Sequence, residues 1–255
     1  MTQIYLEGAI LISIYMVVWF FICQWQKDNS LVDVAWGLGF VTVVWWMYFA
    51  HYAYQNMVLV IMVTLWGLRL AVYLLVRNLK KGEDWRYREM KQNWGRRQAV
   101  NAFFKVFLLQ GGFMWIICLP LFQPTFVKEP MLQSIGGLFW LIGFLWEAIA
   151  DWQLYRFKQS EGNTGKIMTA GLWQFSRHPN YFGEIVLWWG IFLYVIPYSS
   201  SWLILLSPIT ITWLLMRVSG VPLLEKKYKN NPDYREYVQR TNALFPNFFT
   251  KKTNS

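Results

Sequence analysis

Charged residues are scarce in this sequence, and so are the residues that build disulfide or metal frameworks. Only 15% of its 255 residues are charged, whereas soluble domains usually contain about 25%. The two cysteines lie in apolar segments, so neither a disulfide framework nor a zinc site is predicted. With only two histidines, a histidine metal cluster is also excluded. This composition argues against both an ordinary soluble enzyme and a disordered chain.

Long apolar runs dominate the chain instead. Hydrophobic residues make up 56% of it and aromatic residues 20%. Since a membrane-spanning helix needs about 20 mostly apolar residues, we predict an all-α polytopic membrane protein. It would be a seven-transmembrane-helix bundle in which residues 1–255 form a single integral membrane domain. The predicted spans are residues 4–23, 32–52, 57–76, 103–122, 132–155, 181–198 and 201–218.

The basic residues predict the orientation of these spans. In the seven-span arrangement, 22 of the 24 lysines and arginines fall on one side of the membrane. The positive-inside rule makes that side cytoplasmic, which places the N-terminus outside and the C-terminus in the cytoplasm. Topology therefore explains the net charge of +10, and no nucleic-acid partner is predicted. We expect a lipid bilayer as the environment and a bacterial inner membrane as the location.

The largest basic loop, residues 77–105, has two interpretations. It mixes Trp85, Tyr87 and Trp94 with nine lysines and arginines. Such a segment is either an interfacial helix that lies on anionic lipid or a lid over a phosphate-bearing cofactor. The interfacial helix is the favoured interpretation.

Ionisable residues inside a span are candidates for a functional site, because charge in hydrocarbon is costly. Glu147, Asp151, Tyr155 and Lys158 fall on one helical stripe of the fifth span. A polar stripe that reaches the cytoplasmic end is typical of a pocket wall. The alternative is an intrahelical ladder packed against neighbouring helices.

Asp33 opens the second span and shares a helical face with Trp36. It is either a functional carboxylate or a first-turn residue favoured by the helix dipole. In the second case Ser30 would be the cap and Asp33 would occupy the capping-box position.

Arg69 lies within the third span, on a face with Trp66 and Tyr73. An arginine at this depth needs an anionic partner. A structural ion pair with Asp33 or Glu184 and a contact with a bound ligand are both open.

The stretch 171–190, GLWQFSRHPNYFGEIVLWWG, carries the most chemistry. Arg177 and His178 flank a predicted helix start, where an anion can bind. Asn180 and Glu184 follow four residues apart on one helical face. A ligand-binding role is favoured over a helix cap with a buried acceptor.

Three segments together resemble the steroid 5-alpha-reductase C-terminal superfamily, and more closely its bacterial branch, the DUF1295 proteins. They are EAIADWQLYRFK, GLWQFSRHPNYFGE and the tail LLEKKYKNNPDYREYVQR. The likeness covers most of the chain and is strongest at residues 140–248. The branch is also similar to isoprenylcysteine and phospholipid methyltransferases, which share the Arg-His-Pro-x-Tyr motif that runs here from Arg177 to Tyr181.

The resemblance implies a membrane-embedded enzyme that uses NADPH to reduce a carbon–carbon double bond conjugated to a carbonyl. The substrate would be a steroid-like or other small lipophilic molecule, and the cofactor pocket would open to the cytoplasm. Together with the polar stripe and the helix start, the resemblance predicts one set of cofactor-binding residues. They are Glu147, Asp151, Tyr155, Lys158, Lys166, Arg177, His178, Asn180, Tyr181, Glu184 and Glu225.

The resemblance also predicts catalytic residues in the first half of the chain. The family's catalytic glutamate is matched by Asp33, and its catalytic tyrosine falls near Trp66. Since tryptophan has no suitable acidic proton, Tyr73 on the same face is the candidate phenol. Trp36, Trp66 and Arg69 are expected to bind the substrate, and no metal ion is expected.

Two other classes of function stay open. An S-adenosylmethionine-dependent methyltransferase fits the Arg177–Tyr181 motif, although only Glu225 remains of that family's Glu-Glu pair. A non-enzymatic lipid-binding or transport protein is compatible with seven spans that contain charges. The sequence shows no matching halves that would favour a transporter. No oligomeric state is predicted.

Overall fold

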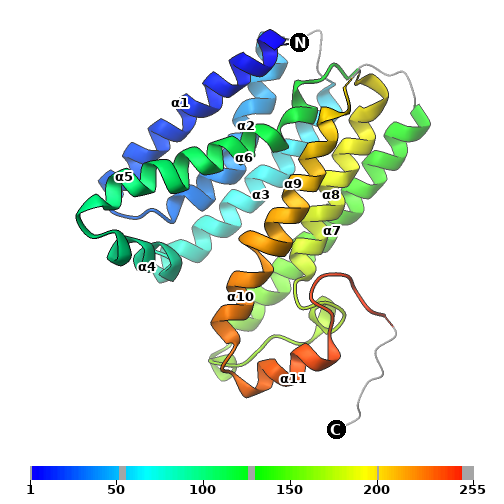
Figure 1. The fold of residues 1–255 in the computed structure, drawn as a ribbon. Coiled ribbons are helices and arrows are strands. Elements are labelled where there is room, and N and C mark those ends of the chain that lie inside the picture. Colours follow the sequence, from blue (N-terminus) through cyan, green and yellow to red (C-terminus); the bar gives the residue numbers. More distant parts are fainter. Residues whose placement is uncertain (1, 52–55, 126–129, 200, 249–255) are drawn as a thin grey trace. The chain divides into compact units, whose positions relative to one another are not determined.

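The computed structural model of the chain describes residues 2–51, 56–125, 130–199 and 201–248. These residues are mostly helical and contain no strand (Figure 1). Seven helical segments among them are long and apolar enough to cross a membrane. The segments are Thr2–Gln26, Leu31–Ala50, Met57–Leu79, Trp85–Ile117, Pro130–Gln159, Pro179–Tyr198 and Trp202–Lys226.

The seven predicted spans are confirmed, and the chain is an integral membrane protein. The bounds differ most in the fourth span, which begins at Trp85 rather than at residue 103 and ends at Ile117 rather than at residue 122. The loop 77–105 is largely helical as a result. Position 52, the last residue of the predicted second span, lies outside the described residues.

The structure divides into two compact units, and each is described by itself. The first unit contains Met1–Lys128 and Val195–Ser207, and the second contains Glu129–Tyr194 and Pro208–Ser255. The single domain expected for the whole chain stays a prediction.

Three long helices and one segmented helix make up most of the first unit. The long helices are α1 (Thr2–Gln26), α2 (Leu31–Ala50) and α3 (Met57–Lys81). The segmented helix consists of α4 (Trp85–Trp94), α5 (Gln98–Ala102), a π-helical stretch (Phe103–Leu108) and α6 (Leu109–Ile117).

The apolar surface of α1 shows why this unit suits a bilayer. Leu6, Ile10, Ile14 and Val18 recur every four residues, and each keeps at least half of its surface exposed. This spacing places them on one helical face. Such a stripe would be unfavourable in water, whereas in a membrane it contacts acyl chains.

The turn between α3 and α4 determines where α4 begins. Gly82 has a φ of +66°, in the left-handed region that favours glycine. Asp84 then caps α4, because its carboxylate accepts a hydrogen bond from the backbone N–H of Arg86 at 3.0 Å. The cap places Arg86 and Tyr87 in the first turn of α4.

The second unit contains most or all of five helices. They are α7 (Pro130–Gln159), α8 (Pro179–Val195), α9 (Leu206–Trp213), α10 (Val221–Tyr228) and α11 (Pro232–Arg240). A π-helical stretch, Leu214–Val218, follows α9.

Glycines allow α7 and α8 to pack closely together. A Cβ atom added to Gly183 would lie 2.6 Å from the backbone nitrogen of Glu147 and 2.7 Å from the carbonyl oxygen of Gly143. No larger residue fits this contact without a shift of the backbone. The contact brings the start of α8, including Glu184, next to the acidic part of α7.

The C-terminal segment packs against the loop that precedes α8. The Tyr237 hydroxyl donates to the carbonyl oxygens of Trp173 and Ser176, and Ser176 Oγ donates to the carbonyl oxygen of Leu244 at 2.7 Å. The ring of Phe248 contacts Phe175, with 5.1 Å between the ring centroids. The start of α8 is therefore fixed by residues that lie far away in the sequence.

Candidate functional site

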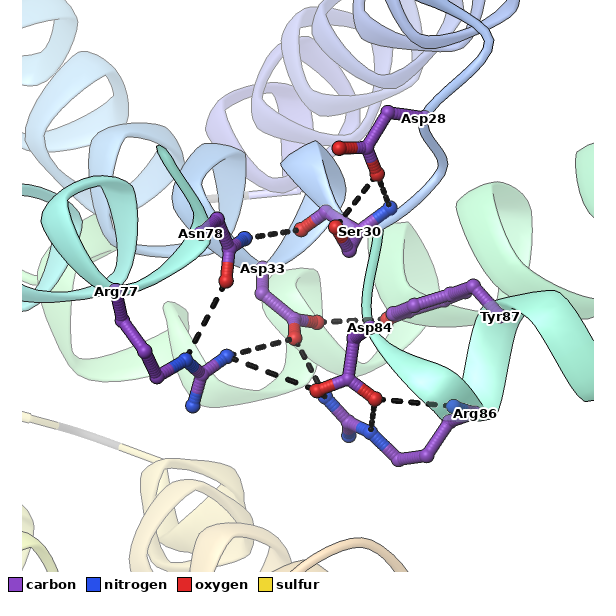
Figure 2. Close-up of polar contacts among 8 residues, drawn as sticks. All are labelled: Asp28, Ser30, Asp33, Arg77, Asn78, Asp84, Arg86 and Tyr87. Carbon is purple, nitrogen blue, oxygen red and sulfur yellow. Dashed lines mark hydrogen bonds and ion pairs between the residues drawn. The ribbon is translucent and has the colours of Figure 1, made fainter. Parts of the chain in front are cut away.

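The first unit gathers an ionic cluster at the start of α2 (Figure 2). Asp33 accepts hydrogen bonds from the Tyr87 hydroxyl at 2.6 Å and from Arg86 Nη2 at 2.7 Å. Arg77 of α3 lies further away, with its Nη2 atom 3.8 Å from Asp33 Oδ2 and 4.0 Å from Asp84 Oδ2. Asp33 therefore connects α2 to α4 directly and to α3 by charge.

Ser30 occupies the N-cap position of α2 and Asp33 lies in its first turn, but the capping hydrogen bonds of a capping box are not made. Ser30 has helical backbone angles, φ −71° and ψ −13°, and its side chain makes no capping hydrogen bond. Its hydroxyl donates to Asp28 instead. The Asp33 carboxylate accepts from Arg86 and Tyr87 rather than from a backbone N–H group. The cations beside Asp33 are Arg86 and, further away, Arg77.

Two carboxylates and two guanidinium groups balance the charge of this ionic cluster. Arg86 Nε donates to Asp84 Oδ1 at 3.0 Å. Burial alone would raise the pKa of Asp84, but the hydrogen bonds and the charge of Arg86 outweigh it and lower that pKa. Arg77 Nη2 is buried and has no hydrogen-bond partner among the described residues. This N–H group can donate to a bound oxygen atom.

The phenol that is hydrogen-bonded to Asp33 is that of Tyr87. The predicted Tyr73 is half-buried on α3, and its catalytic role stays a prediction. Tyr87 is only 5% exposed. Its role was not predicted, because a tyrosine in a basic, aromatic segment is typical of an interfacial helix. Asp84, a good capping residue two positions before Arg86, was the available signal for a helix start here.

The predicted substrate-binding residues lie on α2 and α3 of the first unit. Trp66 is fully buried and packs edge-on against Phe40, with 5.3 Å between the ring centroids. Trp36 is half-buried and contacts the other side of Phe40 at 5.4 Å. Arg69 is half-buried on α3. Of the two tryptophans, Trp36 retains more surface for a ligand.

The second unit contains a separate polar cluster between α7 and α8. Asn180 Nδ2 donates to Asp151 Oδ1 at 3.2 Å. Glu147, Asp151 and Glu184 are at most 7% exposed. Further along the α7 stripe, Tyr155 is half-buried and Lys158 is exposed. The predicted stripe therefore changes from buried carboxylates to an exposed cation along α7.

Arg177 is held by the C-terminal segment. Its Nη2 and Nε atoms donate to Glu225 Oε1 at 2.6 and 3.1 Å, and its Nη1 atom donates to the carbonyl oxygens of Val238 and Thr241. These four hydrogen bonds use all the nitrogen atoms of the guanidinium group. In this structure Arg177 therefore connects the motif before α8 to α10 and α11.

His178, next to Arg177, is 3% exposed. Its ring stacks on Tyr181, with 5.4 Å between centroids and 12° between planes. Its Nε2 atom lies 3.8 Å from Glu225 Oε1, which is too long for a direct hydrogen bond. Burial lowers the pKa of His178, although Glu225 opposes the shift, and the ring is neutral near pH 7.

Several buried polar atoms of the second unit have no hydrogen-bond partner among the described residues. Near the start of α8 they include both ring nitrogens of His178 and the Asn180 Oδ1 atom, and on α11 the Tyr234 hydroxyl. Buried polar groups are normally hydrogen-bonded, so each such atom requires an explanation. A polar ligand that binds at the start of α8 would satisfy them. Lys166, which was predicted to bind the same ligand, is exposed.

No group of three or more histidine, cysteine, aspartate or glutamate side chains in the described parts of the chain is arranged to hold a metal ion.

Comparison with known proteins gives a family without an assigned activity. Residues 19–241 match the family model described as "Protein of unknown function (DUF1295)". An uncharacterised protein of Schizosaccharomyces pombe is 24% identical over 285 residues, which cover 96% of this chain and 80% of the relative. No solved structure matches the chain.

Proposed function

Since this chain belongs to the DUF1295 family, we propose that it is a membrane-embedded, NADPH-dependent reductase within the wider steroid 5-alpha-reductase superfamily. It reduces a carbon–carbon double bond conjugated to a carbonyl in a flat lipophilic substrate. One observation carries the proposal: the 2.6 Å hydrogen bond between the Tyr87 hydroxyl and Asp33. Tyr87 supplies the phenol that is missing at the position of Trp66.

The ionic cluster of the first unit supplies what this reduction requires at the carbonyl oxygen. Negative charge develops on that oxygen, and a pre-positioned donor stabilises it. Without substrate, the Tyr87 hydroxyl gives its single proton to Asp33. With substrate bound it turns that proton to the carbonyl oxygen, while Arg86 holds Asp33 in place. The free Nη2 group of Arg77 adds a second, charged donor. Asp33 is then a positioning carboxylate rather than the acid itself.

The polar cluster of the second unit supplies the groups for a nucleotide. NADPH, when bound, delivers the hydride. Asp151 and Asn180 are already paired, and the unpartnered Asn180 Oδ1 and His178 nitrogen atoms fit a ligand rich in hydroxyl and amide groups. Exposed Lys158 and Lys166 offer cations for its phosphates. Arg177 fixes the conformation at the start of α8 through its hydrogen bonds to Glu225, and so contributes indirectly to NADPH binding.

Substitutions in the polar cluster of the second unit are expected to change NADPH binding, and substitutions in the ionic cluster of the first unit are expected to change turnover. Asp151→Ala and Asn180→Ala should weaken NADPH binding at least tenfold, as measured by fluorescence titration of the purified protein. Asn101→Ala, an amide change outside the cluster, is the matched control. Unchanged NADPH affinity in both cluster variants would remove the cofactor assignment.

Tyr87→Phe should leave NADPH affinity intact and lower turnover by about a hundredfold, since general acids contribute about 10²–10⁴-fold. Turnover is followed as NADPH oxidation with a 3-oxo-4-ene steroid as the model enone. Tyr15→Phe removes a comparable phenol bond, 2.7 Å to the carbonyl oxygen of Ala35, and is the control. If Tyr73→Phe instead abolished turnover while Tyr87→Phe did not, the phenol assignment would pass to Tyr73.

A second candidate function is supported by the ion pair of Arg177 with Glu225. This pair joins the Arg-His-Pro-x-Tyr motif to the one glutamate that remains from the methyltransferase pattern. The candidate is an S-adenosylmethionine-dependent methyltransferase of the isoprenylcysteine or phospholipid type. A bound ligand raises the melting temperature, so the two cofactors can be compared directly. A rise with S-adenosylmethionine but not with NADPH would favour this function over the reductase.

A further inference from the structure

The cations of the segmented helix differ in their partners. Arg86 and Lys91 form ion pairs inside the unit, the latter with Glu83 at 2.6 Å. Arg97 and Lys105, by contrast, are exposed and form no ion pair or hydrogen bond through their side chains within the described residues. Together with Asn101 they recur every four residues, which places them on one face.

Exposed apolar side chains accompany these cations. Val100 is 61% exposed and Phe104 is 59% exposed. Along the chain these apolar residues lie between the two cations, so charged and lipid-facing side chains are interleaved. Such interleaving is typical of the boundary between the headgroups and the acyl chains of a bilayer.

A groove continues from this boundary between α6 and α1. It has a volume of about 260 Å³. Its floor is formed by small residues, and the hydrogen bond from Trp115 Nε1 to the carbonyl oxygen of Tyr5 at 3.0 Å holds its far end. The residues that define it are Ala9, Ser13 and Met16 of α1, Leu108 of the π-helical stretch, and Gly112 and Trp115 of α6.

The distance along the helix from Lys105 to the last groove residue, Trp115, is close to the thickness of one leaflet. Trp115 follows Lys105 by ten residues, which at 1.5 Å per residue is about 15 Å. Half of the hydrocarbon core of a bilayer is also about 15 Å thick. A molecule with its charged end at Lys105 and an extended chain in the groove would thus remain within a single leaflet.

We propose that this surface, from Arg97 and Lys105 to the groove at Gly112, binds one anionic phospholipid. The headgroup phosphate lies against Arg97 and Lys105, and one acyl chain occupies the groove. Charge complementarity selects the headgroup, and the continuity of the cations with an apolar groove selects a lipid rather than a free anion. The site is independent of the proposed reductase activity, which uses other residues.

The groove can be filled without disturbing the fold. A Cβ atom added to Gly112 meets nothing within 4 Å, so Gly112→Leu places a side chain in open space. Gly137 on α7 is also a membrane-span glycine with nothing within 4 Å, and Gly137→Leu is the matched control. Arg97→Gln with Lys105→Gln removes the cations. Its control is Lys229→Gln with Arg235→Gln, which removes two exposed cations near α11.

The test measures phosphatidylglycerol bound to the purified protein in detergent by native mass spectrometry, with phosphatidylcholine as competitor. We expect Gly112→Leu and the Arg97/Lys105 double variant each to lower affinity on the order of tenfold or more, while both controls and NADPH affinity stay unchanged. High salt should weaken binding in the wild type.

Three results would overturn the proposal. One is retention of phosphatidylglycerol in both site variants equal to that in the controls. Another is a change of oligomeric state in Gly112→Leu with lipid binding intact, which would make the groove a contact for a second copy. The third is an equal thermal shift from inorganic phosphate alone, which would make it a site for a soluble anion. If Gly112→Leu failed to fold, the double variant, whose groove is intact, would still decide.

Discussion

The polar clusters of the two units differ in how completely their buried polar groups are hydrogen-bonded. Around Asp33, two carboxylates and two guanidinium groups satisfy one another, and only Arg77 Nη2 is left without a hydrogen bond. At the start of α8, by contrast, buried atoms of His178, Asn180 and Tyr234 have no hydrogen-bond partner within the described residues. A satisfied network holds helices in position, whereas an unsatisfied one is prepared for a ligand.

The largest effect is expected from breaking the satisfied cluster. Asp33→Ala leaves Arg86 and Arg77 without their shared carboxylate, and removal of one partner from a partly buried ion pair costs about 3 kcal/mol. The measurement is thermal or denaturant unfolding in a mild detergent. Asp233→Ala, which removes an exposed carboxylate of α11, is the control. If the two variants were equally stable, the cluster around Asp33 would contribute nothing to the fold.

A smaller effect is expected from separating the helices that form the unsatisfied cluster. Gly183→Ala forces a Cβ atom to within 2.6 Å of the backbone nitrogen of Glu147. Overpacking of this kind costs about 2 kcal/mol, and it should also weaken NADPH binding because it moves Asn180 away from Asp151. Gly137→Ala, on the open side of α7, should be neutral or slightly stabilising. Equal behaviour of the two variants would contradict the close packing of α7 and α8.

The smallest effect concerns the pH dependence of stability. Burial lowers the pKa of His178 below its ordinary value of 6.5, an effect that Arg177 reinforces and Glu225 opposes. At a pH between the lowered pKa of the folded state and the ordinary pKa of 6.5, His178 binds a proton in the unfolded chain but not in the folded chain. The contribution of His178 to stability is therefore fully present above pH 6.5 and falls as the pH drops toward the folded pKa.

His178→Gln should flatten this dependence between pH 7.5 and pH 5.5, as measured by the unfolding free energy at each pH. The first unit should add little in this window, because the pKa of Asp84 is lowered below 3.8 and its titration lies further toward acid. An unchanged slope in His178→Gln would mean that the ring is not buried as a neutral group.

The sequence predicted the spans well because they depend on local composition. Runs of about 20 apolar residues and the distribution of lysines and arginines are properties of the chain itself, whatever packs beside them. The polar stripe that contains Glu147 and Asp151 was predictable for the same reason, since helical periodicity alone places its members on one face.

The partners of the charged residues were not predictable in this way. Asp33 has the spacing of a capping box, and only the return of α4 to α2 shows that it binds Arg86 and Tyr87 instead. Likewise Arg177 was expected to face a ligand, but residues some fifty positions later, beginning with Glu225, bind its guanidinium group.

By itself, the sequence determined that this protein is helical, that it crosses the membrane in seven segments, and which of its charges lie within them. These properties follow from the free energy of placing each side chain in hydrocarbon or in water, which is additive along the chain. The tertiary structure alone decided which charges are neutralised, which phenol accompanies Asp33, and which buried atoms are left for a ligand. Hydrogen bonds and ion pairs act over a few ångströms between distant residues, so they are fixed only when the helices pack.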